Sequence, residues 1–172
     1  TQTGAWYESH DYPAQGKIVD FVILMTYEWG WSGGPPMPVS PITQVKRVVD
    51  YALSVIPANK IVMSIPLYGY DWTLPYKPGG EFAKALNPLQ AVELARKYNV
   101  EIKYDQKEEA PYFRYTDKDG KKHIVWFEDL RTMDAMFELV KKDKLKGVSF
   151  WNLAFRFPQV WPMLQDYFII SK

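Results

Sequence analysis

The sequence predicts an α/β protein built from parallel strand–helix units. Three short apolar runs have the character of strands, and segments with helical spacing of apolar residues follow them. Runs that are apolar on both faces are typical of strands buried in a parallel sheet. Each run ends in a cluster of aromatic and polar side chains, within residues 21–29, 61–72 and 147–152. Because α/β folds bind ligands at the carboxyl ends of their strands, these clusters predict a binding cleft.

Strand and helix patterns alternate along the first hundred residues. Residues 30–41 are rich in glycine and proline, which break the apolar periodicity of both helices and strands, so this segment is predicted to be irregular. Pro57 stops the helix that precedes the second strand. Asn87 followed by Pro88 predicts a helix start, with a capping side chain and a proline at the first helical position. In order, the patterns predict a loop (1–16), a strand (18–27), an irregular segment (30–41), a helix (42–56), a strand (60–68) and a capped helix (87–98).

The second half begins with a predicted antiparallel insertion over residues 100–127. Asp117-Lys-Asp-Gly120 is a hairpin turn signal between two strand-like runs. Asp129 caps the next helix, and a strand over 147–152 and a short helix over 157–168 end the chain. The capped helix is expected to face inward with Leu130, Met133, Met136, Phe137 and Val140. The closing helix is expected to have as its apolar side Trp161, Leu164 and Phe168.

Chain length limits the architecture. A complete (β/α)₈ barrel takes about 250 residues, whereas this chain has 172 residues and only three apolar strand runs. It is too short for a whole barrel and unusual for a doubly wound sheet. We expect barrel strand–helix units in residues 1–99, the antiparallel insertion in residues 100–127 and a last strand–helix unit in residues 128–172.

Composition argues against several classes of function. The net charge of +1 disfavours a dedicated nucleic-acid binder, and no apolar run reaches the roughly 20 residues of a membrane helix. The chain has no cysteine, which excludes disulfides and thiolate metal sites. His10 and His123 are isolated and no phosphate-binding glycine motif occurs, so neither a metal nor a cofactor is expected. The N-terminus lacks both Met and a signal pattern, and we expect a chain processed or excised from something longer.

One hydrolase motif occurs in a context that does not suit it. Gly30-Trp-Ser-Gly-Gly34 matches G-x-S-x-G, which works where a strand turns sharply into a helix and exposes the serine. Here Pro35 and Pro36 follow, so no helix can start, and His123 lies in the expected hairpin. The favoured interpretation is a flexible loop over a cleft.

The candidate binding residues lie at the three strand ends. Flat rings beside hydrogen-bonding groups suit a sugar better than a phosphate, and Gly69 allows a close backbone approach or a bulge. A plainer interpretation is that Tyr27 and Glu28 close a strand end and that Trp151 belongs to the core. Aromatic and polar side chains occur together at all three strand ends, and this favours a binding role, because packing of a core does not require them to gather there. The predicted residues are Met25, Tyr27, Glu28, Trp29, Tyr68, Tyr70, Asp71, Trp72, Trp151 and Asn152.

These motifs and their order resemble the C-terminal half of a family 18 glycoside hydrolase, the chitinase-like family. The resemblance is strongest to bacterial spore cortex-lytic and germination N-acetylglucosaminidases. The family's M-x-Y-[DN] motif is matched by Met25, Tyr27 and Glu28, and its P-x-Y-G stretch by residues 66–69. The resemblance covers nearly the whole chain. It implies the C-terminal portion of a TIM (β/α)₈ barrel, about strands six to eight, with a small antiparallel insertion.

The resemblance implies substrate-assisted hydrolysis of β-linked N-acetylglucosamine polymers, either chitin or spore cortex peptidoglycan, at the spore or cell envelope. The substrate's N-acetyl oxygen attacks the anomeric carbon while an enzyme glutamic acid protonates the leaving oxygen. Tyr27 would be catalytic, donating a hydrogen bond to the acetamido group, and Glu28 would bond the sugar beside the cleavage point. Trp151, matching the tryptophan of the family's last strand, would be the floor under the reacting sugar, and Met25 would line the pocket.

Two departures from the family pattern affect these expectations. Glu28 stands where the family has Asp or Asn, which leaves its contact open. The family's D-x-x-D-x-D-x-E run, which carries the proton donor, does not occur in these 172 residues. We therefore expect the chain alone to be inactive and, because a partial barrel exposes apolar strand edges, to self-associate. The alternative is a carbohydrate-binding module without catalysis.

Overall fold

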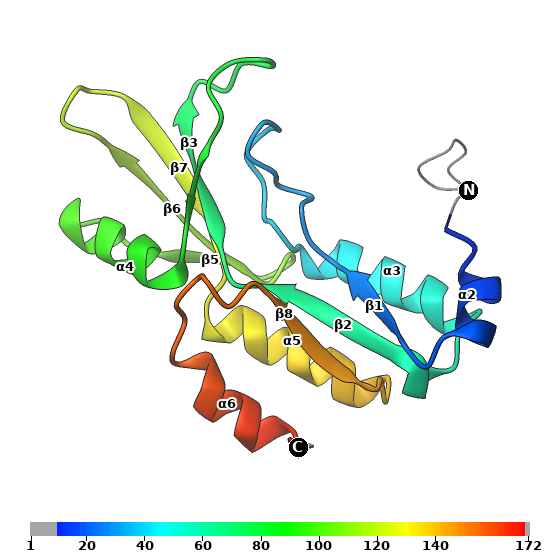
Figure 1. Cartoon of the computed structure of the whole chain (residues 1–172). Coiled ribbons are helices and arrows are strands. Elements are labelled where there is room, and N and C mark those ends of the chain that lie inside the picture. The colour runs from blue at the N-terminus through cyan, green and yellow to red at the C-terminus, as the bar shows by residue number, and fades with distance from the viewer. Residues whose placement is uncertain (1–9, 171–172) are drawn as a thin grey trace.

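The computed structural model describes residues 10–170. Figure 1 shows two parts that meet where β2 passes into β3: a parallel sheet backed by helices and an antiparallel sheet with its own helix. In chain order the elements are α2 (Tyr12–Ile18), β1 (Val22–Met25), α3 (Ile42–Leu53), the 3₁₀ helix η1 (Ala58–Lys60), β2 (Ile61–Pro66), β3 (Gly69–Leu74), β4 (Lys84–Leu86), α4 (Pro88–Lys97), β5 (Lys103–Asp105), β6 (Ala110–Thr116), β7 (Lys122–Trp126), α5 (Leu130–Lys142), β8 (Gly147–Trp151) and α6 (Val160–Tyr167).

A three-stranded parallel sheet forms the first part. Its order is β1-β2-β8, as expected when helices connect successive parallel strands. Paired residues place Met25, Ser64 and Ser149 in one row across the sheet. Two rows further on, Pro66 pairs with Trp151 at the carboxyl ends of β2 and β8. The three predicted strands therefore do end at one common edge.

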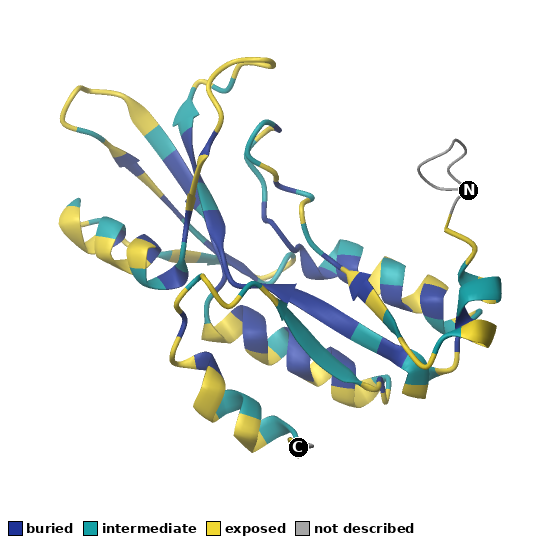
Figure 2. Ribbon diagram, viewed as in Figure 1, coloured by how far each residue is buried: buried dark blue, intermediate teal, exposed yellow. Residues whose placement is uncertain are grey.

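Helices α3 and α5 cover one face of this sheet, and the main core lies between them and the strands (Figure 1). Val45 and Val49 of α3 and Phe137 of α5 are fully buried, together with Met63 of β2. Burying one such side chain contributes about 1.5–3 kcal/mol. Figure 2 shows that β1 and β8 consist mainly of exposed or half-buried residues, whereas β2 is buried at all but one position. The core therefore occupies only one side of the sheet.

The expectation of strands buried on both faces is wrong for two of the three strands. β2 lies between two neighbours and is almost wholly buried. In β1, however, Ile23 and Met25 are 48% and 66% exposed, and Trp151 at the end of β8 is 51% exposed. These strands lie at the edges of a sheet with one uncovered face, which an apolar sequence run cannot reveal.

A helix precedes the first strand, contrary to the prediction. The Asp11 side chain accepts a hydrogen bond from Ala14 N at 3.0 Å and caps α2. The predicted loop over residues 1–16 is therefore wrong from Tyr12 onward, and residues 1–9 lie outside the described part of the chain. The predicted strand over 18–27 shortens to β1, because α2 occupies its first position.

Most other predicted elements are confirmed with adjusted ends. Residues 30–41 hold no helix or strand, and Asn87 caps α4. α3 ends at Leu53, three residues before the predicted position. Leu130 in α5 and Trp161 in α6 are exposed although both were expected to face inward. Each lies in the first turn of its helix, where fewer neighbours pack around it.

The antiparallel part is larger than the insertion expected over residues 100–127. Its five strands follow the order β4-β3-β7-β6-β5, and β3 and β4 precede residue 100. The predicted hairpin of β6 and β7 is confirmed. α4 covers one face of this sheet, where its Ala91 and Ala95 pack with Phe113. The run after β2 was interpreted as a strand end, whereas it continues as β3.

Gly69 joins the two sheets. A Cβ at this position would lie 2.3 Å from the carbonyl oxygen of Trp126 and 2.5 Å from Cα of Phe127, so only glycine fits. This is the close backbone approach predicted for Gly69. Only Leu67 and Tyr68 separate β2 from β3. The end of the parallel sheet and the start of the antiparallel sheet are therefore held side by side.

A buried carboxyl group lies just after β7. Glu128 is 0% exposed, and within the described residues its oxygens make no hydrogen bond of good geometry. Burial raises the pKa of Glu128 well above its usual range, and the charge of Asp129 raises it further. Thr132 and the backbone of Ser40 are close enough to lower it, with a smaller effect. The carboxyl group is therefore held in its neutral form.

Replacing Glu128 by Gln is expected to change how stability depends on pH. Because the folded-state pKa is raised, the unfolded chain loses the proton first. Wild-type stability is therefore full below the ordinary glutamate pKa, about 4.3, and falls as pH rises towards the folded-state value. The amide has no such proton, so the difference in unfolding free energy should move in favour of Glu128→Gln between pH 4 and pH 8.

Urea unfolding of both proteins at the two pH values measures this difference. Glu138→Gln, at an exposed position of α5, is the control and should show no comparable change. A difference between Glu128→Gln and wild type that stays constant with pH would contradict a neutral buried carboxyl.

Candidate functional site

The ends of the parallel strands bring predicted residues together at one edge of the sheet. Met25 ends β1, and Tyr27 follows by two residues, the spacing that returns a side chain to the same side of an extended chain. Trp151 ends β8 and pairs with Pro66 at the end of β2. Six of the ten predicted residues gather here: Met25, Tyr27, Glu28, Tyr68, Tyr70 and Trp151.

Two hydrogen bonds of Thr26 fix the chain immediately before Tyr27. The buried Thr26 hydroxyl donates a hydrogen bond to the carbonyl oxygen of Ser64 at 2.8 Å, and the Ser40 hydroxyl donates to the carbonyl oxygen of Thr26. Burial raises the pKa of Tyr27, an interaction with the Ser64 side chain lowers it, and the charge of Glu28 raises it. The net shift is upward, so the phenol stays neutral and can donate a hydrogen bond. Ser64 was not predicted as a site residue.

Two tyrosine hydroxyls converge on one oxygen of Glu28. Tyr68 donates a short hydrogen bond to Oε1, and Tyr70 donates to the same atom at 3.0 Å. Burial, followed by the charge and hydrogen bond of Glu28, raises the pKa of both phenols. Glu28 itself has φ of 69°, an uncommon conformation for a residue with a side chain. A carboxylate from the parallel part is thus bound by tyrosines at the start of the antiparallel part.

Aromatic rings extend from this cluster in two directions. The Tyr68 ring centroid lies 5.5 Å from that of Tyr70 and 5.3 Å from that of Phe155. On the antiparallel sheet, Tyr70 pairs with Trp126, which pairs with Tyr112, and these last two rings lie 4.5 Å apart. Strand alternation puts this row on the face opposite α4. None of the three was predicted: strand register brings Trp126 beside Tyr70 and Tyr112 beside Trp126. Phe155 lies in the segment after β8 and reaches Tyr68 only through the fold of that segment.

Trp151 presents a half-exposed indole beside these groups. Its carbonyl oxygen accepts a hydrogen bond from Leu67 N at 2.8 Å, which ties the end of β8 to the end of β2. The peptide bond between Trp151 and Asn152 is cis. The Asn152 side chain accepts a hydrogen bond from Ala154 N at 2.9 Å and so caps the following turn. The indole therefore offers a flat apolar surface, whereas the neighbouring amide has a local structural partner.

Asp71 does not join the cluster. It lies on the other side of β3 from Tyr70, as strand alternation requires. There it accepts a hydrogen bond from the Tyr115 hydroxyl at 2.6 Å and pairs with His123 at 3.0 Å. The second nitrogen of His123 lies 3.4 Å from Asp117. This buried network links the strands of the antiparallel sheet under α4.

Two predicted tryptophans pack inside the protein. Trp72 is buried, and its indole nitrogen donates a hydrogen bond to the carbonyl oxygen of Gly34 at 3.0 Å. This bond holds the 30–41 loop against the antiparallel sheet. Trp29 is half-buried and packs against the main core. Neither ring is part of the Glu28–Tyr68–Tyr70 cluster.

The chemistry of the site is that of hydrogen-bond donors, one carboxylate and apolar rings. Within residues 10–170, no group of three or more His, Asp and Glu side chains is placed to hold a metal ion. No helix in that range combines the length and the apolar character needed to cross a membrane. Donors, a carboxylate and exposed rings are the groups with which proteins bind uncharged polar ligands such as sugars.

Comparison with known proteins decides the family. The family model "Glycosyl hydrolases family 18" matches residues 1–155. The chain belongs to glycosyl hydrolases family 18. Among relatives, it is 57% identical over 172 residues to the cortical fragment-lytic enzyme of Bacillus subtilis (strain 168), and the match covers 100% of this chain and 40% of that protein.

Solved structures agree with the family 18 assignment. The crystal structure of the Bacillus cereus spore cortex-lytic enzyme SleL matches with a TM-score of 0.98 and 52% identity, over 100% of this chain and 40% of that one. SleL of Bacillus megaterium QM B1551 matches with a TM-score of 0.95 and 56% identity, over 99% and 39%. The chain thus spans about 40% of the length of these relatives. The resemblance predicted from the motifs is confirmed.

Replacing Asp71 by Asn is expected to weaken the fold and to leave sugar binding unchanged. The substitution removes the charged acceptor of buried hydrogen bonds, which should lower the unfolding free energy by about 1–3 kcal/mol. Chemical unfolding measures the loss, and tryptophan fluorescence titration with chito-oligosaccharides measures binding. Asp119→Asn, at the exposed hairpin turn, is the control. Weaker sugar binding with unchanged stability would show that Asp71 contacts ligand after all.

Proposed function

We propose that the chain is the C-terminal portion, about strands six to eight, of a (β/α)₈-barrel glycosidase that hydrolyses β-linked N-acetylglucosamine polymers. Spore cortex peptidoglycan is the favoured substrate, and the spore or cell envelope the place of action. Family 18 membership and the similarity to enzymes named as cortex-lytic support this. In this assignment, the part of residues 1–99 that ends with β2 and residues 128–172 supply barrel units, and the antiparallel sheet that begins with β3 forms one wall of the cleft.

The observation that carries the proposal is the position of Tyr27. Its neutral phenol lies at the end of a parallel strand, next to Glu28 and on the edge where Trp151 exposes half of its ring. These are the positions of the family motif in this sequence. No other described part of the chain combines a fixed phenol, a carboxylate and an exposed indole at parallel strand ends.

In the proposed reaction, the acetamido oxygen of the substrate attacks the anomeric carbon and forms an oxazolinium-like intermediate while the leaving oxygen takes a proton. Water then opens the intermediate with retention of configuration. Tyr27 donates a hydrogen bond to the acetamido group, which holds it in line for attack and stabilises the charge that develops. Trp151 supports the apolar face of the sugar, Met25 lines the pocket, and Glu28 bonds a neighbouring hydroxyl.

The proton donor of this reaction comes from a family motif that these 172 residues do not contain. The chain by itself is therefore proposed to bind glycan without cutting it. For the isolated chain this coincides with the second candidate function, a carbohydrate-binding module. The two differ in what happens when the missing barrel strands are restored.

A chimera separates these functions. Residues 1–172 would replace the matching 40% of the Bacillus subtilis cortical fragment-lytic enzyme, to which they are 57% identical. We expect the chimera to release product from cortex peptidoglycan and Tyr27→Phe to lower its kcat by about 10²–10³-fold, as for loss of one donor to a transition-state charge. KM should change little, because the bond strengthens as charge develops.

Tyr51→Phe, at an exposed position of α3, is the matched control and should keep full activity in the chimera. The 172-residue chain alone should release no product. Product release by the chain alone, or an active chimera indifferent to Tyr27→Phe, would contradict the proposed role of the strand ends.

The isolated chain is also expected to self-associate. Within the described residues, β1 and β8 each pair with only one neighbour, and Ile23 and Met25 are exposed on the uncovered face of the sheet. Such edges pair with other chains. Light scattering across a concentration series should give a mass above one chain, and Ile23→Lys should lower it. A monodisperse monomer at all concentrations would contradict this expectation.

A further inference from the structure

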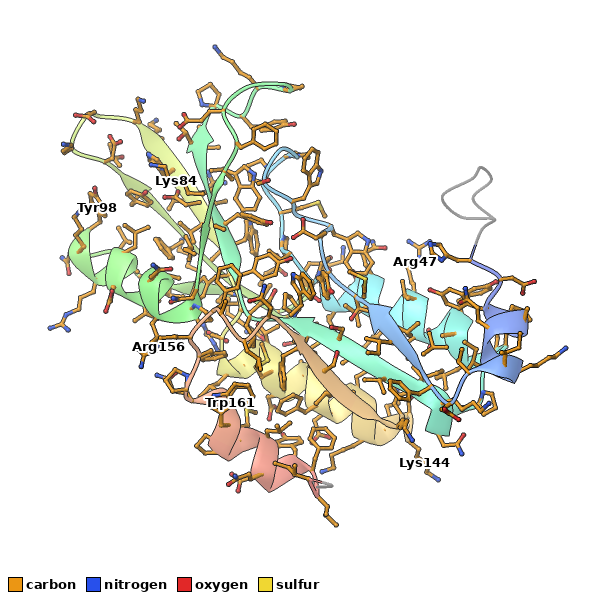
Figure 3. All side chains as sticks on the ribbon, in the orientation of Figure 1. Arg47, Lys84, Tyr98, Lys144, Arg156 and Trp161 are labelled. Atoms are coloured by element: carbon orange, nitrogen blue, oxygen red, sulfur yellow. The ribbon has the colours of Figure 1, made fainter. Side chains whose placement is uncertain are left out.

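Among the described residues, the Glu28 carboxylate has no ion-pair partner within 4.0 Å. Its hydrogen-bond partners are two phenols. Figure 3 shows the labelled basic side chains dispersed over separate elements: Arg47 on α3, Lys84 on β4, Lys144 after α5 and Arg156 before α6. The whole chain has a net charge of +1, yet the carboxylate of this site is held by phenols and not by a cation.

The two tyrosines orient this charge without neutralising it. Both hydroxyls bind Oε1, and among the described residues Oε2 has no hydrogen-bond partner. The phenols keep their protons because burial and Glu28 raise their pKa. Glu28 is solvent-exposed, so Oε2 is available to a ligand as an acceptor only.

We propose that Glu28, held by Tyr68 and Tyr70, makes this site select neutral sugars against sugars that carry a free carboxylate. The inference rests on the proposed glycan-binding function and adds a charge rule to it. A hydroxyl or amide N–H of a neutral sugar can donate a hydrogen bond to Oε2, which favours its binding. A carboxylate has no proton to donate at neutral pH and meets a like charge.

The expected loss of affinity depends on how exposed to water Glu28 and the carboxylate of the ligand are. Two like charges about 4 Å apart in a largely aqueous setting repel enough to weaken binding roughly fivefold, and more where water is partly excluded. Salt screens such a pair, since the Debye length falls to about 3 Å at 1 M ionic strength. A polymer whose acid groups are amidated or esterified should therefore bind better than one with free acids.

Three probes of the same length test the rule on the full 172-residue chain. They are fully N-acetylated chitotetraose, the same tetrasaccharide oxidised to carboxylates at C6, and the methyl ester of that oxidised form. Tryptophan fluorescence at low salt gives the affinities. We expect the carboxylate probe to bind about fivefold to tenfold more weakly than its ester, and 1 M salt should reduce this ratio.

Variants assign the effect to one side chain. Glu28→Gln keeps an acceptor oxygen and removes the charge, so the ester-to-acid ratio should fall to about one. Glu93→Gln, on the exposed side of α4 behind the antiparallel sheet, should keep the wild-type ratio. A wild-type ratio near one, or a preference that survives Glu28→Gln, would overturn the charge rule and leave glycan binding standing. Binding of none of the three probes would overturn the proposed function and the rule with it.

Discussion

At Gly69, the first residue of β3, the backbone at the end of β7 passes so close that a single methyl group would collide with it. Only two residues separate Gly69 from β2, so this contact within the antiparallel sheet fixes where Tyr68 and Tyr70 stand relative to the ends of the parallel strands. Both hydroxyls then reach Glu28, which follows β1 of the parallel sheet. The candidate site is therefore built across two sheets, and its geometry depends on the absence of a side chain at one position.

The chemistry follows from this junction. The parallel strands provide a fixed phenol and a half-exposed indole at their common edge, and the antiparallel sheet adds the phenols that orient a carboxylate. No group in the cluster is a cation, and the phenols are held as donors by burial and by the carboxylate. These properties suit a hydroxyl- and amide-rich ligand. They agree with membership of a glycosyl hydrolase family, whose mechanism uses the ligand's own amide as nucleophile.

The sequence predicted the features that depend on residues close together in the chain, and not those that depend on how distant segments pair. The apolar runs, the cap at Asn87 and the close approach at Gly69 are local patterns, and the structure confirms the strands, the cap and the approach. The motif around Tyr27 is also local, and the family that it resembles is confirmed by the family match. The side to which Asp71 points was not local, because it required knowing that β3 belongs to an antiparallel sheet. Trp126 reaches Tyr70 only through the pairing of β3 with β7, and Phe155 reaches Tyr68 only through the course of the chain after β8. The exposure of β1 was missed because apolar residues look alike whether a second layer covers them or not.

A crystal structure of the chimera with a bound chito-oligosaccharide tests the central claim most directly, namely that the strand ends form the sugar site. We expect one sugar ring over the Trp151 indole, its acetamido oxygen within hydrogen-bond distance of the Tyr27 hydroxyl, and a neighbouring hydroxyl donating to Oε2 of Glu28. A sugar bound elsewhere, with Tyr27 and Trp151 facing solvent, would contradict it.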